Sequence, residues 1–424
     1  MGWRFWKPKS SHAALAHKRQ HPDRKIGKDW IPALRGNDEQ TVKYRPAIFI
    51  APLANLIPSM IVATLGFALR EVSHTLSLSA LEAGSLFSAI FVFASIGSAI
   101  GGRLSDKIGR KTVMVLGVIL LSLGFFIAGY AETYAFMTAF LAITGLGYGL
   151  TTPSLYALMS DLLPERRGLG ATLVSVSYGI GVSAGAVIAS FILARVHWQI
   201  AFLAVGLFGF LIAGVEAFAV KNARRDGAHA RLRYRDVLSK PLVVLALAEF
   251  FGGSVFWSSA SWTATVLRTA KGLNLAETGF VMGLWGLTPM IGALVLGPLS
   301  DKFGRRYIIL RSAFPSAVAA FVSYQWLASP LALAIGLMIF GILKASVPTL
   351  IVPLAQESAS PDAAGAAAGV IMSMHYVAAV VAPLVTAALI TGTGRMILSM
   401  ILTAVIPLII YGCLIATVRE KHAG

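Results

Sequence analysis

A charged stretch that occurs twice constrains what this chain can fold into. The stretch GRLSDKIGRK, residues 102–111, lies between two long apolar runs, and GPLSDKFGRR, residues 297–306, repeats it. The starts at residues 102 and 297 give an offset of 195 residues, and the aspartate, second glycine and following basic residues align without a gap. A repeat of this kind indicates that the chain is built from two similar halves.

The composition indicates a membrane protein. Of the 424 residues, 56% are hydrophobic and only 13% are charged, which is too little charge to cover the surface of a soluble domain. Apolar runs of ~20 residues, enough to cross a hydrocarbon core of ~30 Å, recur about twelve times. The sequence therefore predicts an all-α membrane protein with about twelve transmembrane helices, near residues 46–69, 83–101, 112–130, 134–159, 169–194, 198–219, 241–267, 277–297, 307–328, 330–355, 363–391 and 396–417.

The offset of 195 residues extends beyond the charged stretch. Pro46 corresponds to Pro241, and Glu82 corresponds to Glu277. Six spans in each half keep the two halves in the same orientation, which predicts two pseudo-symmetric six-helix bundles. The expected organisation is an N-terminal tail (1–45), a first bundle (46–220), a linker rich in Arg, Lys and Asp (221–240), a second bundle (241–418) and a short C-terminus (419–424).

The net charge of +17 lies mostly on one side of the predicted membrane. Basic residues gather in the tail, in the two repeated stretches and in the linker, so the positive-inside rule places these segments and both termini in the cytoplasm. The protein is thus expected in the inner (cytoplasmic) membrane, with a basic tail that is either disordered or lies on anionic lipid. No nucleic-acid motif accompanies the charge, and the single Cys413 supports neither an intrachain disulfide nor a thiol metal site, so no nucleic acid, metal or cofactor is expected.

The repeated stretches suggest a pair of breakable ionic contacts. Gly102 and Gly109 are expected to permit tight packing and a sharp turn, while Asp106 can accept hydrogen bonds or pair with a base. Arg110 has a candidate partner in Asp161, at the end of span four. In the second half, Arg305 has Glu357 in the matching place. The expected gating latch comprises Gly102, Asp106, Gly109, Arg110, Lys111 and Asp161 with Gly297, Asp301, Gly304, Arg305, Arg306 and Glu357. The alternative is that these residues only set membrane topology.

The duplicated stretch resembles the signature loop of the major facilitator superfamily, here between spans two and three and again between spans eight and nine. The resemblance covers residues 46–418 and implies two bundles that rock about a central site, with the loops locking one conformation through salt bridges. Two family patterns differ in this chain. Leu141 stands where many proton-coupled members carry an arginine, and Val182 stands where antiporters often carry a proline. The second departure weakens an exporter interpretation.

Three ionisable residues, Glu249, Lys344 and His375, lie within the predicted spans of the second half. Charge in the hydrocarbon region is costly unless it is paired or lines a cavity, so each is a candidate functional residue. The family resemblance places Glu249 and Lys344 on facing walls of the transport route, at depths that allow a direct pair. We expect Lys344 to hold an anionic substrate group and Glu249 or His375 to carry a proton. The alternative is an ion pair between Glu249 and Lys344 that only ties helices together.

Other polar and aromatic residues are weaker candidates, because aromatic side chains in membrane helices also serve packing. Those that could shape a substrate site are Asn55, Tyr148, Tyr178, Trp257, Trp285 and Tyr376. Charged residues near the span ends are expected to be solvated or to extend toward the interface, namely Glu216, Arg311, Arg70, Glu71 and Arg268.

These features favour a secondary transporter, and most specifically proton-coupled uptake of a small organic anion, such as a mono- or dicarboxylate, by alternating access. The expected partners are the substrate, protons and the lipid bilayer. The protein is expected to be a monomer. A drug or metabolite exporter working by proton antiport is the alternative, and a non-transporting membrane sensor is a further one. The sequence offers no phosphate-binding loop, metal cluster or activated nucleophile, so an enzyme is not expected.

Overall fold

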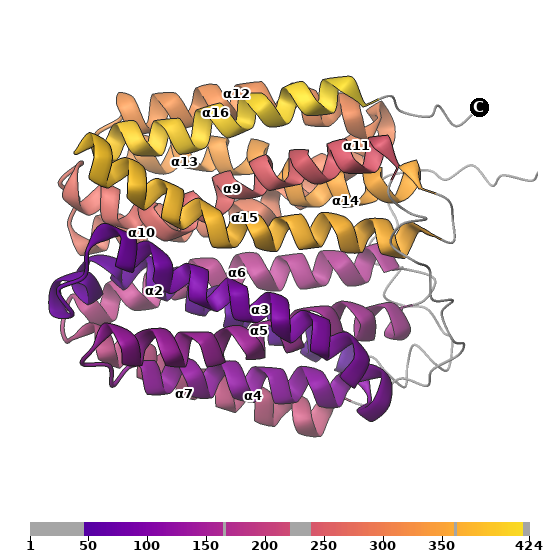
Figure 1. The fold of residues 1–424 in the computed structure, drawn as a ribbon, viewed down its shortest axis with the longest axis horizontal. Coiled ribbons are helices and arrows are strands. Elements are labelled where there is room, and N and C mark those ends of the chain that lie inside the picture. Colours follow the sequence, from indigo (N-terminus) through magenta and orange to yellow (C-terminus); the bar gives the residue numbers. More distant parts are fainter. Residues whose placement is uncertain (1–45, 164–166, 221–238, 360–362, 419–424) are drawn as a thin grey trace, which may run out of the picture. The chain divides into compact units, whose positions relative to one another are not determined.

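The structure is a computed structural model that describes residues 46–163, 167–220, 239–359 and 363–418. The expected tail at 1–45, nearly all of the linker at 221–240 and the C-terminus at 419–424 lie outside the described residues. Within the described ranges the chain forms long helices that run side by side (Figure 1). Twelve helical spans there are long and apolar enough to cross a membrane, as the sequence predicts.

Each half contains six of the twelve spans within the described residues. The first half consists of the short 3-10 helix η2 (Ala51–Asn55), α2 (Leu56–Thr75), α3 (Ala80–Ile108), α4 (Arg110–Ala128), α5 (Tyr134–Leu162), α6 (Arg167–Leu193) and α7 (Trp198–Ala219). The second half consists of α9 (Lys240–Thr269), α10 (Leu275–Gly286), α11 (Thr288–Phe303), α12 (Arg305–Gln325), α13 (Pro330–Lys344), α14 (Ser346–Ser358), α15 (Ala364–Thr393) and α16 (Met396–Thr417).

The first span extends further than predicted. It runs over Pro46–Thr75, whereas the sequence suggested an end at residue 69 before the charged pair Arg70 and Glu71. The helix continues because its last turn is held by neighbouring helices. Trp198 at the start of α7 donates a hydrogen bond from Nε1 to Oγ1 of Thr75 (3.1 Å).

Three spans are interrupted, and in two of them a proline removes a backbone donor at the break. In span eight, Pro289 cannot donate to the carbonyl of Trp285, and the hydroxyl of Thr288 bonds that oxygen instead (2.7 Å). In span ten, Pro348 cannot donate to the carbonyl of Lys344, and α13 ends at Lys344. The breaks lie between η2 and α2, between α10 and α11, and between α13 and α14.

Glycines in α5 permit close packing inside the first half. A Cβ atom added at Gly145 or at Gly149 would collide with carbonyl oxygens of α3, those of Ile90 and Ala94. On another side of the helix, a Cβ at Gly147 would collide with the backbone of α4 at Leu121. Small residues spaced in this way allow membrane helices to approach closely, so α5 packs tightly against both α3 and α4.

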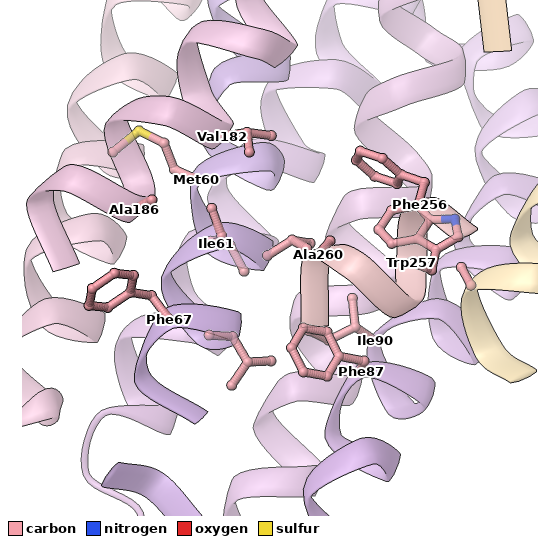
Figure 2. Packing of buried hydrophobic residues seen from close by; sticks show 14 of the residues in the cluster. Met60, Ile61, Phe67, Phe87, Ile90, Val182, Ala186, Phe256, Trp257 and Ala260 are labelled. Atoms are coloured by element: carbon pink, nitrogen blue, oxygen red, sulfur yellow. The ribbon is translucent and has the colours of Figure 1, made fainter. Parts of the chain in front are cut away.

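We define the loop end of the molecule as the end that carries the turns at Gly109 and Gly304, and the far end as the opposite one. The halves meet through α2 with α9, α3 with α15, and α6 with α10 and α11. Figure 2 shows part of the shared apolar core, with labelled side chains that include Met60, Phe87, Val182 and Trp257. A Cβ at Gly66 of α2 would collide with the carbonyl oxygen of Ala260 in α9, so these two helices are in close contact in the half of the membrane near the far end.

Candidate functional site

Glu249 of α9 and His375 of α15 form a buried pair. Nδ1 of His375 lies 2.6 Å from Oε1 of Glu249, and Glu249 is only 1% exposed. Gly253, one turn further along α9, makes room for the imidazole, since a Cβ there would lie 3.3 Å from Nδ1. One hydrogen must lie between the two atoms, donated either by the imidazole N–H or by the O–H of a protonated carboxyl group. The contact is therefore a place where one proton is shared.

The other carboxylate oxygen of Glu249 is unsatisfied. Oε2 is buried and has no hydrogen-bond partner among the described residues. A buried polar oxygen without a partner is unfavourable, so this side of the carboxyl group is open to a further hydrogen-bond donor.

Lys344 is the last residue of α13 and is only 4% exposed. Its Nζ lies 4.1 Å from the ring centroid of Phe256, a cation–π contact, and no carboxylate of the described chain lies within 4.0 Å of it. The alternative of a direct ion pair between Lys344 and Glu249 is therefore not what this structure shows. Phe256 follows Glu249 by seven residues, about two turns along α9, and the ammonium group lies over its ring rather than against the carboxylate.

Aromatic side chains from both halves surround this region. Phe256 stacks on Trp285 with ring centroids 5.8 Å apart and also contacts Trp257 at 4.9 Å. Trp257 lies 5.4 Å from His375 and 4.1 Å from Phe91 of the first half. Contacts of the remaining predicted aromatic residues join Tyr148 to Phe91, Tyr178 to Phe256 and Tyr376 to His375.

Sequence reasoning missed Phe91 and Phe256, and little in the sequence could have found them. An apolar ring in an apolar span carries no signal, apart from the position of Phe256 directly before Trp257. Asn55 forms a contact of a different kind, a hydrogen bond to the backbone. Its Nδ2 donates to the carbonyl of Val174 (3.2 Å), which ties η2 to α6 within the first half. A role for Asn55 in substrate binding stays a prediction.

Both ion pairs expected from the repeated stretches are present. Nη1 of Arg110 lies 2.5 Å from Oδ2 of Asp161, and Nε of Arg305 lies 2.7 Å from Oε1 of Glu357. Arg305 also contacts Asp301 at 3.3 Å. The side chain of Asp106, the counterpart of Asp301, lies outside the described residues. Each pair joins helices of the same half, α4 with α5 and α12 with α14, and the gating role stays a prediction.

The last basic residue of each stretch binds a helix end. Lys111 donates from Nζ to the carbonyl of Ala217 near the end of α7 (2.7 Å), and Arg306 donates from Nη2 to the carbonyl of Ala416 near the end of α16 (2.6 Å). Cations are favourable at helix C-termini because the exposed carbonyls carry partial negative charge. The repeat therefore holds the last helix of each half at the loop end, a role that the sequence did not suggest.

The glycines of the repeated stretches have different roles. Gly109 and Gly304 have φ values of 95° and 92°, a conformation that favours glycine, so the predicted sharp turn is confirmed. The expected tight packing at Gly102 is wrong. A Cβ added there, or at Gly297, would have nothing within 4 Å.

Breaking the ion pair of the first half is expected to destabilise the protein more than breaking that of the second. Side-chain exposure is 23% for Asp161 and 52% for Glu357, and water screens the more exposed pair. We expect Asp161→Asn to lower the free energy of unfolding by about 1 kcal/mol and Glu357→Gln by clearly less. Thermal unfolding of both variants in the same detergent tests this order. Equal or reversed losses would contradict it.

The expectation for charged residues near the span ends is wrong for three of the five, whereas Arg70 and Arg311 are exposed as expected. Glu216 of α7 is fully buried. The reason is that α7 packs against η2, α2 and α4. Glu71 and Arg268 are not separately solvated but form an ion pair between α2 and α9.

Twelve spans in two similar halves, with buried ionisable and aromatic residues between them, define a multi-pass membrane transporter rather than an enzyme. A family model described as Major Facilitator Superfamily matches residues 51–383 and 242–423. The chain belongs to this superfamily.

Known proteins agree with this assignment. The 4-hydroxybenzoate transporter PcaK of Acinetobacter baylyi is 24% identical over 74% of this chain and 79% of its own. The gentisate transporter of Corynebacterium glutamicum is 26% identical over 72% of both chains. The fold matches the crystal structure of a bacterial homologue of the human lysosomal transporter Spinster, with a TM-score of 0.75 and 16% identity over 90% of this chain and 99% of that one.

Proposed function

We propose that the protein takes up small organic anions, in particular aromatic carboxylates, together with protons. The observation that carries this proposal is the buried ammonium group of Lys344, which has an aromatic ring but no carboxylate of the described chain beside it. An unneutralised cation inside the membrane is costly, and a substrate carboxylate would neutralise it. A buried lysine that awaits its counterion is thus suited to binding an anion.

The aromatic surroundings favour an aromatic substrate. Phe256 and Trp285 form a stacked pair of rings next to Lys344, and Trp257 links this pair to His375. Aromatic rings favour offset stacking and edge-to-face contact with other rings. The two named relatives are transporters of 4-hydroxybenzoate and gentisate, both of which are aromatic carboxylates.

The pair formed by Glu249 and His375 is our candidate for proton coupling. It holds a proton within the same aromatic cluster, so binding of the substrate and of the proton can influence each other. We infer that the loop end faces the cytoplasm, because both basic repeats lie there. Opening of the far end would then admit substrate from outside, and opening of the loop end would release it inside.

Uptake into proteoliposomes tests this function. With an acidic exterior, we expect accumulation of radiolabelled 4-hydroxybenzoate or gentisate, and no accumulation of 4-hydroxybenzamide, which has the same ring but lacks the charge. Succinate tests whether dicarboxylates are also accepted. Accumulation that requires an acidic interior, so that protons leave as the substrate enters, would support proton-driven export instead. A preference for cationic drugs would support the same alternative. Transport of the amide equal to that of the acid would contradict an anion site at Lys344.

A further inference from the structure

An ion pair at the far end joins the two halves. Nη2 of Arg268, in the last turn of α9, lies 2.5 Å from Oε1 of Glu71, in the last two turns of α2. By contrast, the ion pairs of Arg110 with Asp161, of Arg305 with Asp301 and Glu357, and of His375 with Glu249 each join residues of the same half. The contact of Gly66 with Ala260 lies just below it on the same two helices. If α2 and α9 separate at the far end, this pair must break.

The same arginine lines a cavity of about 460 Å³ at the far end. The cavity lies between α2, the turn from α6 to α7, and α9, with walls that include Arg70, His74, His197 and Trp198. This volume falls within the range of about 300–1,000 Å³ that is usual for small-molecule sites. Trp198 is fixed by its hydrogen bond to Thr75, so its position in the wall is set.

The guanidinium of Arg268 is only partly satisfied. Its side chain is 8% exposed, yet Nε and Nη1 are buried with no hydrogen-bond partner in the described chain. Guanidinium groups bind carboxylates through two parallel N–H donors, and Glu71 occupies only one nitrogen here. The cavity is lined by two arginines, Arg70 and Arg268, against the single carboxylate of Glu71, so its charge favours an anion.

We propose that this cavity is a second anion site, which captures the carboxylate of the substrate at the far end before it reaches Lys344. Arg268 binds the carboxylate, and Trp198 provides an aromatic wall. Glu71 competes for the arginine and holds it while the far end is closed. The choice of an organic carboxylate as ligand rests on the proposed function. The site itself is separate, because Arg268 follows Phe256 by twelve residues, about 18 Å along α9.

Chemical modification of Arg268 by phenylglyoxal tests the site in the full-length protein, with each arginine quantified by mass spectrometry. Benzoate is the probe and neutral benzamide is its matched control. We expect benzoate at ten times its dissociation constant to slow labelling of Arg268 about tenfold. Arg195, an exposed arginine at the same end but outside the cavity lining, should react at an unchanged rate.

Two variants make the result specific. In Lys344→Ala, protection of Arg268 by benzoate should persist, since the two sites are separate. In Glu71→Gln, labelling of Arg268 without benzoate should become faster, and protection should require less benzoate, because the competing carboxylate is gone. Equal labelling with and without benzoate, equal protection by benzamide, or no labelling of Arg268 in either the wild type or Glu71→Gln would overturn the proposal. Failure of the proposed function would appear separately, as absence of pH-driven uptake.

Discussion

Lys344→Ala is expected to abolish uptake of the anionic substrate. The substitution removes the cation that we propose as the partner of the substrate carboxylate, at a position where the lysine is only 4% exposed and lies over the ring of Phe256. A charge-assisted hydrogen bond contributes about 1.5–3 kcal/mol, so the dissociation constant should rise by about 100-fold. Removal of an unneutralised buried charge should not destabilise the fold, and thermal unfolding should occur at an unchanged or higher temperature.

The measurement is equilibrium binding of radiolabelled substrate to purified protein, followed by uptake into proteoliposomes. Lys271→Ala is the matched control, because Lys271 lies in the turn between α9 and α10, where it donates to the carbonyl of Leu327. This variant should bind substrate normally. Normal affinity in Lys344→Ala would remove the main support for an anion transporter and leave the exporter as the better interpretation.

The helical spans and their repeat could be predicted because they depend on features that extend along the chain. An apolar run of about twenty residues has few alternatives to a transmembrane helix. The repeat also predicted both loop-end ion pairs, since Arg110 and Arg305 occupy matching turns beside helices that end in Asp161 and Glu357. The positive φ of Gly109 and Gly304 followed from the same pattern.

The partners of the buried ionisable residues could not be predicted, because they depend on depth and rotation to within one helical turn. Glu249 and Lys344 lie on spans that can face each other, but the break after Lys344 places its ammonium over Phe256 instead. His375 reaches Glu249 because Gly253 leaves space, which requires the register of α15 against α9. The sequence identifies these residues, but the register of one helix against the other cannot be derived from it.

Charged residues near the span ends show a related difficulty. A glutamate close to a helix end is usually placed in water, yet Glu216 is fully buried because α7 is covered by helices of the first half. Glu71 and Arg268 belong to different halves, and the offset of 195 residues does not relate them, since it pairs position 71 with 266. An internal repeat predicts contacts within each half, whereas contacts between the halves have no counterpart in it.

Glu249→Gln is expected to separate transport from the proton gradient. The amide is nearly the same size as the carboxyl group, and its oxygen can still accept a hydrogen bond from Nδ1 of His375, so the local packing should be kept. It cannot release a proton. A pH difference of one unit is worth about 1.4 kcal/mol per proton, which supports about tenfold accumulation of substrate. In the variant this accumulation should disappear, while exchange of labelled for unlabelled substrate at equal pH should continue.

The two assays, gradient-driven uptake and exchange at equal pH, are run on the same proteoliposomes so that loss of coupling is distinguished from loss of binding. Glu132→Gln, in the exposed turn between α4 and α5, makes the same chemical change outside the membrane and should leave both rates unchanged. His375→Asn shows which member of the pair is required, because it removes the imidazole and leaves the carboxyl group. If Glu249→Gln still accumulates substrate about tenfold per pH unit, Glu249 does not carry the coupled proton, and the pair serves only to hold α9 against α15.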